Sequence, residues 1–140
     1  MLDFSGFNTL DKMSFLDDAF QCNIKANAIM LPRAGWLFQL RDCYVTRPRH
    51  WGITSIGTDC KGMLIDNCFF HTADNEKLAQ DRESIALNAN SNDVRLRNNW
   101  AFQFRHFAEF SGSYNVISGN HFCQGDRFQD GLRLAGIVLA

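Results

Sequence analysis

Charged residues gather in four short segments of this 140-residue chain, and each segment contains an arginine. The segments are Arg47-Pro48-Arg49-His50, Asp81-Arg82-Glu83, Arg105-His106, and Asp126-Arg127 followed by Asp130. An arginine fork binds a carboxylate through two parallel hydrogen bonds and remains charged at physiological pH. A histidine, with an ordinary pKa of about 6.5, can take up a proton near neutral pH. These residue types predict a surface for anionic groups, with His106 and Arg82 as first candidates for proton abstraction.

A repeated pattern surrounds these segments. Its order is apolar, x, apolar, x, Asn or Asp, x, aromatic, and we place its copies at residues 14–20, 38–44, 63–69, 94–100 and 116–122. The aromatic anchors are Phe20, Tyr44, Phe69, Trp100 and Phe122, with steps of 24, 25, 31 and 22 residues between them. Repeats of this length are typical of solenoids, in which each unit buries its apolar face only against its neighbours.

The alternation inside each copy favours a parallel β-helix over the other solenoids. A leucine framework is absent, and the apolar residues recur with period 2 rather than 3.6. We expect the asparagines to form corners and to hydrogen-bond along a ladder, since Asn tolerates left-handed backbone geometry. The corner residues would be Asn67, Asn98 and Asn120. The core aromatics stacked beside them would be Tyr44, Phe69, Trp100 and Phe122.

From about Ile29 to Leu134 the pattern resembles the right-handed parallel β-helix repeats of the pectate-lyase-like superfamily. That superfamily includes polysaccharide lyases, family-28-type glycoside hydrolases, alginate epimerases and phage tailspikes. We therefore predict an all-β, right-handed parallel β-helix of about four to five coils. As a single domain it comprises a cap or degenerate coil at 1–27, coils at 28–134 and an apolar tail at 135–140, and we expect it to be a piece of a longer solenoid. For residues 9–21 a short capping helix and a degenerate coil both remain open.

The resemblance implies a groove along the first parallel sheet, flanked by the charged segments and filled by an acidic polysaccharide. The catalytic candidates are His106 and Arg82 as bases for elimination or epimerisation, with Glu109 to orient the histidine or act as an acid. The candidate substrate-binding residues are Arg49, His50, Arg105, Arg127, Asp81 and Asp130. Hydrolysis would need two or three carboxylates on one face, and the available ones have mismatched registers.

Two hypotheses follow from different functional classes. The first is a carbohydrate-active enzyme, a lyase, epimerase or hydrolase, and the second is a non-catalytic β-helix module for glycan binding or assembly. Close His, Arg and Glu side chains in a concave groove would favour the first, whereas a flat stripe with large exposed aromatic contacts would favour the second. The calcium-binding acid cluster of pectate lyases is not recognisable, and we expect no metal and no cofactor.

Composition adds several expectations. A net charge of −1 argues against a nucleic-acid partner. The sequence contains no run of 18 apolar residues, so it predicts no membrane span. The start, MLDFSGFNTLDK, lacks the pattern of a signal peptide, while the resemblance favours an extracellular or cell-surface location. Of the five cysteines, Cys43 and Cys68 share one repeat position and are expected to be buried thiols. The apolar C-terminal tail predicts a homo-oligomeric contact or further chain.

Overall fold

A computed structural model of the chain describes residues 2–3, 14–16, 19–21, 28–31, 34–48, 51–55, 59–71, 83–86, 92–102, 104, 106–110, 112–123 and 137–139. Within these ranges every regular element is a β-strand, and neighbouring strands are parallel. No helix occurs in this part of the chain. The prediction of an all-β fold built from parallel sheets is confirmed.

The described residues form three long sheets and one short sheet. The first sheet has the order β1-β4-β8-β12-β15-β18, with β1 (Leu2–Asp3), β4 (Ile29–Leu31), β8 (Trp51–Ser55), β12 (Glu83–Ala86), β15 (His106–Phe110) and β18 (Ile137–Leu139). The second has the order β16-β13-β10-β6-β2, with β2 (Ser14–Leu16), β6 (Gln39–Arg41), β10 (Leu64–Asp66), β13 (Arg95–Arg97) and β16 (Val116–Ser118). The third has the order β17-β14-β11-β7-β3, with β3 (Ala19–Gln21), β7 (Tyr44–Thr46), β11 (Phe69–His71), β14 (Trp100–Phe102) and β17 (His121–Cys123). The short sheet pairs β5 (Ala34–Trp36) with β9 (Asp59–Lys61).

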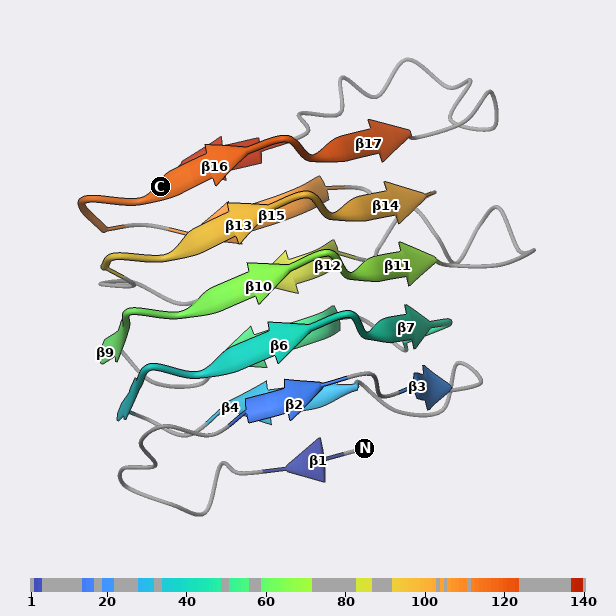
Figure 1. Cartoon of the computed structure of the whole chain (residues 1–140), viewed down its shortest axis with the longest axis horizontal. Helices are drawn as coiled ribbons and strands as arrows, with labels where there is room; N and C mark the ends of the chain where they lie inside the picture. Colours follow the sequence, from blue (N-terminus) through green and yellow to red (C-terminus); the bar gives the residue numbers. More distant parts are fainter. Residues whose placement is uncertain are drawn as a thin grey trace.

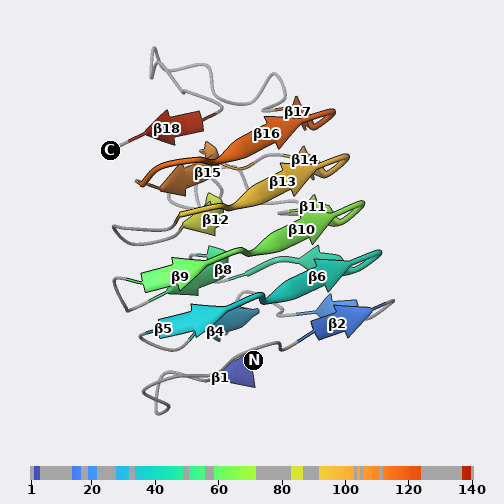
Figure 2. The ribbon, with the colours of Figure 1, turned by 60° about the vertical axis from the view of Figure 1, so that its left-hand side comes forward.

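The chain passes through the three long sheets in the same order several times, and we call each passage a coil. The strands of each sheet lie one above another in Figure 1, with the second and third sheets side by side. Figure 2 shows β1 and β18 towards opposite ends of the stack. Because each sheet gains one strand per coil, the arrangement is compatible with a β-helical solenoid.

Two columns of residues with positive φ mark the corners on either side of the second sheet. The first corner column is Leu37 (60°), Gly62 (65°), Asp93 (57°) and Tyr114 (62°). The second corner column is Asp42 (55°), Asn67 (51°), Asn98 (56°) and Gly119 (63°). Asn, Asp and Gly enter this left-handed region at the lowest cost, which explains the composition of the second column. The prediction that asparagine forms a corner is confirmed at Asn67 and Asn98.

The core lies between the three long sheets. At six of the eight corners the residue directly after the corner is buried, as are the central residues of the strands that follow these six. After the corners these residues are Phe38, Met63, Val94, Cys43, Cys68 and Asn99. In the strands they are Leu40, Ile65, Leu96, Val45, Phe70 and Ala101, which face Ile29, Ile53 and Ala108 of the first sheet.

A buried asparagine ladder follows the second corner column. The amide oxygen of Asn99, which is 0 % exposed, accepts a hydrogen bond from the backbone N–H of Cys68 at 2.9 Å. Its amide nitrogen donates to the carbonyl of Ile65 at 2.9 Å and to the amide oxygen of Asn120 at 3.0 Å. Asn120 in turn donates to the carbonyl of Leu96 at 2.8 Å. The ladder thus satisfies backbone groups that the tight corner leaves without strand partners.

The predicted repeat has the correct register in its three middle copies and is shifted by one residue in the outer two. Leu64 pairs with Gln39 and with Arg95, as the copies starting at 38, 63 and 94 require. Arg95, however, pairs with Val116, so the last copy begins at 115. Ser14 pairs with Gln39 and not with Phe38, so the first copy begins at 13.

Two expectations are wrong, the first because of this shift and the second because the aromatic residues of the middle copies face outward. Gly119, and not Asn120, takes the corner, while Asn120 joins the buried ladder beside Asn99. The aromatics do not form a core stack: Tyr44 is 44 % and Trp100 48 % exposed, and the register partner of Trp100 is His121. Phe122 is the inward residue of its strand and packs against the core.

The N-terminal alternatives are also resolved in the described residues. Ser14–Leu16 and Ala19–Gln21 are strands β2 and β3 at the ends of the second and third sheets, which is the degenerate coil and not a capping helix over 9–21. At the other end, Ile137–Leu139 of the apolar tail forms β18, paired with β15.

Candidate functional site

Most of the residues that the sequence nominates for a site lie outside the described residues. These are Arg82, Arg49, His50, Arg105, Arg127, Asp81 and Asp130. In the first charged segment Arg47 is described: it follows β7 with φ 49°, and its backbone N–H donates to the carbonyl of His71 at 2.7 Å. Its Nε atom is buried without a hydrogen-bond partner among the described residues.

The backbones of His106 and Glu109 are placed in β15 of the first sheet. His106 is in register with Glu83 of the preceding coil, and Glu83 is in register with Trp51 one coil earlier. Glu109 is in register with Ala86 and Val138. The first sheet therefore sets a histidine backbone beside that of a glutamate, a pairing that the sequence pattern did not identify.

An exposed aromatic row crosses the outer face of the third sheet. We define the aromatic row as Tyr44, Phe69, Trp100 and His121, which are register partners on successive coils. They lie on the outer face because the next residue in each strand points into the core. Phe102 and His71, two residues further along, extend the same surface.

Neighbouring rings of this face contact one another. Tyr44 stacks on Phe69 with 5.0 Å between ring centroids, and Trp100 stacks on His121 at 4.5 Å. Phe102 joins the two pairs, at 5.5 Å from Phe69 and 6.0 Å from Trp100. A ligand would therefore meet a continuous aromatic surface whose most exposed rings are Tyr44 and Trp100.

A charged ladder lies on the other side of the second corner column, at the end of the second sheet. Asp66 is bound by Arg97, whose Nη2 lies 2.9 Å from Oδ2, and more distantly by Arg41, whose Nε lies 3.9 Å from the same oxygen. The Asp66 side chain is 10 % exposed, whereas both arginine side chains are 47 % exposed. The ladder thus offers two guanidinium groups to solvent around one shielded carboxylate.

Exposed amides at the second corner column lie between the charged ladder and the aromatic row along the chain. Asn67 donates to Asp42 at 2.7 Å, and Asn98 donates to the second oxygen of Asp66 at 3.2 Å. We use the term corner site for the charged ladder, the second corner column and the aromatic row together. It runs along the stack from coil to coil and combines guanidinium, carboxylate, amide and aromatic groups within a few residues of each strand end.

Cys43 and Cys68 lie beneath this corner as buried thiols, as expected, and no disulfide joins them. The Cys68 sulfur donates to the carbonyls of Asp66 and Leu40 at 3.2 and 3.4 Å. Burial is the main cause that raises the pKa of the Cys68 thiol to about 12, and this excludes it as a nucleophile near neutral pH.

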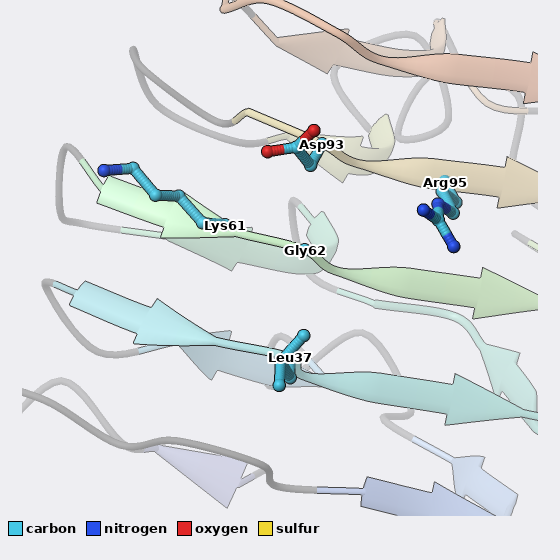
Figure 3. Close-up of a pocket in the computed structure, with 5 residues that line it drawn as sticks. All are labelled: Leu37, Lys61, Gly62, Asp93 and Arg95. Carbon is cyan, nitrogen blue, oxygen red and sulfur yellow. The ribbon is translucent and has the colours of Figure 1, made fainter.

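A hollow of about 320 Å³ lies at the first corner column, on the opposite edge of the second sheet. Its lining residues are Leu37, Lys61, Gly62, Asp93 and Arg95 (Figure 3). No group of three His, Cys, Asp or Glu side chains suited to a metal ion occurs among the described residues. The same part of the chain contains no helix that could span a membrane.

The chain matches no family model, and neither a curated protein nor a solved structure is significantly similar to it. The geometry of the described residues therefore carries the functional argument.

The sequence does not predict the corner site, because its repeat pattern places the aromatic anchors in the core. Period-2 alternation does not say which face of a strand is buried. One signal was present: the residues that alternate with the anchors, Val45, Phe70 and Ala101, are as apolar as a core position requires.

Proposed function

We propose that this chain is a β-helical module that binds a polysaccharide along the corner site. The observation that carries the proposal is the aromatic row. Tyr44 and Trp100 are about half exposed, whereas the next residue in each strand, Val45 or Ala101, is fully buried. Large apolar side chains exposed side by side usually mark an interaction surface. Large exposed aromatic contacts are what the non-catalytic hypothesis expects.

The direction of the row supports a polymer as the ligand. Register partners recur once per coil, at the strand spacing of about 4.8 Å, so equivalent groups are offered repeatedly along the stack. Aromatic surfaces pack against the apolar faces of sugar rings, while the exposed amides of Asn67 and Asn98 can hydrogen-bond to hydroxyl groups. A chain of sugars meets both requirements.

An acidic polysaccharide is the proposed ligand class. Arg41 and Arg97 of the charged ladder each leave about half of their side chain exposed, and arginine binds carboxylates bidentately. Asp66 offsets part of this charge, so the preference for acidic chains is expected to be moderate and to weaken as salt is added. The proposed fold is the right-handed parallel β-helix, since about 98 % of parallel crossover connections within one sheet are right-handed.

Binding is tested by affinity electrophoresis and calorimetry with polygalacturonate, alginate and a neutral glucan. We expect the acidic chains to bind more tightly than the glucan, and Trp100→Ala to weaken binding at least fivefold. Tyr114→Ala is the matched control, since Tyr114 is an exposed aromatic residue at the other corner column, 83 % exposed. Equal binding by wild type and Trp100→Ala, with both chains folded, would remove the corner site from the proposal.

A lyase or epimerase on the first sheet is the second candidate function. The supporting observation is the register of β12 and β15, which sets His106 beside Glu83, adjacent in sequence to Arg82. A carboxylate beside a histidine can orient the imidazole and stabilise its protonated form. Unsaturated product from polygalacturonate or alginate would establish a lyase, and inverted C5 centres without unsaturation would establish an epimerase, provided that the product is lost in His106→Ala and retained in Trp100→Ala. Binding without any product would leave the non-catalytic module.

A further inference from the structure

The three long sheets have matching strands at the two ends of the stack. Each sheet ends with one of the first three strands of the chain, β1, β2 or β3, and with one of the last three, β18, β16 or β17. The strands pair in parallel throughout, so both ends have the same strand direction. Figure 1 shows β2 and β3 towards one end and β16 and β17 at the other. One end of a copy therefore has the strand layout needed to continue the sheets of a second copy.

The hydrogen bonds of the corners point in one direction along the stack. In both corner columns the corner N–H donates to a carbonyl of the following coil, as Asn98 does to Ser118 at 3.1 Å. Tyr114 and Gly119 occupy the two corners of the last coil. Among the described residues no carbonyl accepts from their N–H groups, so the last coil directs two backbone donors out of the stack.

The first coil carries the complementary acceptor. Leu16 has the place of Ser118 in the repeat, directly before the second corner. The carbonyl at this place accepts from the preceding coil, so the carbonyl and the N–H of Leu16 point away from β6 and out of the stack. A second copy placed beyond the last coil would offer this carbonyl to the corner N–H of Gly119.

The apolar core is also suited to continuation at both ends. Phe15 and Phe20 of the first coil and Ile117 and Phe122 of the last are partly buried and pack against the core, whereas Ile65 of a middle coil is fully buried. Stacking of two copies would bring Ile117 to Phe15 and Phe122 to Phe20, and burial of apolar surface drives association. A net charge of −1 gives little repulsion between copies.

One strand occupies the place that the second copy would need. β1 precedes β2 in the chain and lies beyond β4 in the first sheet, where β18 of a preceding copy would pair. Both strands have the same register in that sheet, since Leu2 pairs with Ile29 and Ile137 with Ala108. Joining two copies exchanges the two-residue β1 for the three-residue β18 and adds a strand pair to each of the other two sheets. The exchange therefore favours the joined form.

We propose that this chain docks head to tail onto a second copy of itself. β18, β16 and β17 of one copy pair with β4, β2 and β3 of the next, and β1 of the next copy is displaced. The two contacting surfaces differ, so the contact is heterologous and builds an open row of copies rather than a closed dimer. β1 is thus a removable cap on a sheet edge. The inference goes beyond glycan binding at the corner site and does not depend on it.

The test is sedimentation velocity of the full chain between about 5 and 500 µM, a range in which mass action drives a weak association. We expect species larger than a dimer, with a mean mass that rises continuously with concentration. Hydrogen exchange should show stronger protection of residues 116–122 and weaker protection of β1 in the assembled chain. A chain that stays monomeric or stops at a dimer would refute head-to-tail docking. Loss of protection in β18 with β1 still protected would refute the cap.

Two variants each block one end of the stack. Ile117→Lys places a charge at the inward position of β16, and Leu16→Pro removes the N–H that points out of the stack, which an edge strand tolerates. Each variant alone should be monomeric, whereas their mixture should form a dimer of one copy of each, because one free end of each kind remains. Ile117→Val and Leu16→Ala are the matched controls and should assemble as wild type does. A mixture that stays monomeric, with both variants folded by circular dichroism, would refute the proposed pairing.

Leu2→Asp tests the cap directly. A carboxylate in register with the buried Ile29 should weaken the pairing of β1 and lower the concentration needed for assembly at least about fivefold. An unchanged or higher concentration would overturn the role of β1. Trp100→Ala should assemble as wild type does, so that loss of glycan binding and loss of assembly are separate results.

Discussion

Replacing Asn99 by leucine is the most direct perturbation of the asparagine ladder. The side chain is fully buried, and its removal leaves the backbone N–H of Cys68 and the carbonyl of Ile65 without the partners they have at 2.9 Å. Each buried polar group left unsatisfied costs about 1–3 kcal/mol. Leucine offsets part of this loss by burying more apolar surface, so we expect a net loss of about 2–4 kcal/mol. Total stabilities of domains are about 5–15 kcal/mol, which makes this a large effect.

Urea unfolding followed by far-UV circular dichroism measures the change as a lower midpoint at an unchanged slope. Gln39→Leu is the matched control, because Gln39 lies on the outer face and its register partner is Leu64, so leucine is already accommodated there. Asn99→Cys should fall between the two: a thiol at this position can donate to Ile65, as Cys68 donates to Leu40, but offers Cys68 no comparable acceptor. If Asn99→Leu were within about 0.5 kcal/mol of Gln39→Leu, the ladder would contribute nothing to stability and the reasoning would fail.

Two other predictions concern the same corner. Because the folded-state pKa of Cys68 is raised from 9.0 to about 12, its contribution to stability is complete below pH 9.0 and is lost as pH rises towards 12. When the pH is raised from 9.0 towards 12, urea titrations should therefore show a smaller loss of stability for Cys68→Ala than for wild type. Peptide mapping should find Cys68 alkylated only after unfolding. Gly119→Ala should lose about 1–2 kcal/mol, since φ is 63° and a Cβ atom would lie 2.6 Å from Oδ1 of Asn98. An unchanged urea midpoint in Gly119→Ala would contradict this account of the corner.

The fold class was predictable because corner chemistry and strand alternation repeat together. The register was lost at the last copy, where Gly119 and Asn120 are both suited to a corner. Glycine takes the positive φ, since it has no Cβ to crowd Asn98, and the asparagine moves into the ladder. Three-residue strands contain too little alternation to distinguish these registers.

The candidate site was less predictable, because a one-residue difference in register reverses the two faces of a strand. Trp100 and Phe122 look equivalent as aromatic anchors, yet one lies on the outer face and the other packs against the core. The hollow was also beyond sequence reasoning. Its lining residues come from three successive coils, so finding it requires the register that brings these residues side by side.

The stability of the fold explains why the charged side chains of the corner site are present more fully than it explains the aromatic ones. Asp66 is 7 % exposed overall and needs the hydrogen bonds of Arg97 and Asn98, so these groups would be retained in a chain that bound nothing. Ring contacts between Tyr44 and Phe69 or Trp100 and His121 contribute about 0.5–1.5 kcal/mol each, but smaller β-branched residues would cover the same strands without leaving half of an aromatic ring in water. The exposed aromatic row is therefore the feature that folding explains least. Loss of glycan binding in Trp100→Ala at nearly unchanged stability would assign that feature to recognition, whereas loss of stability alone would assign it to the fold.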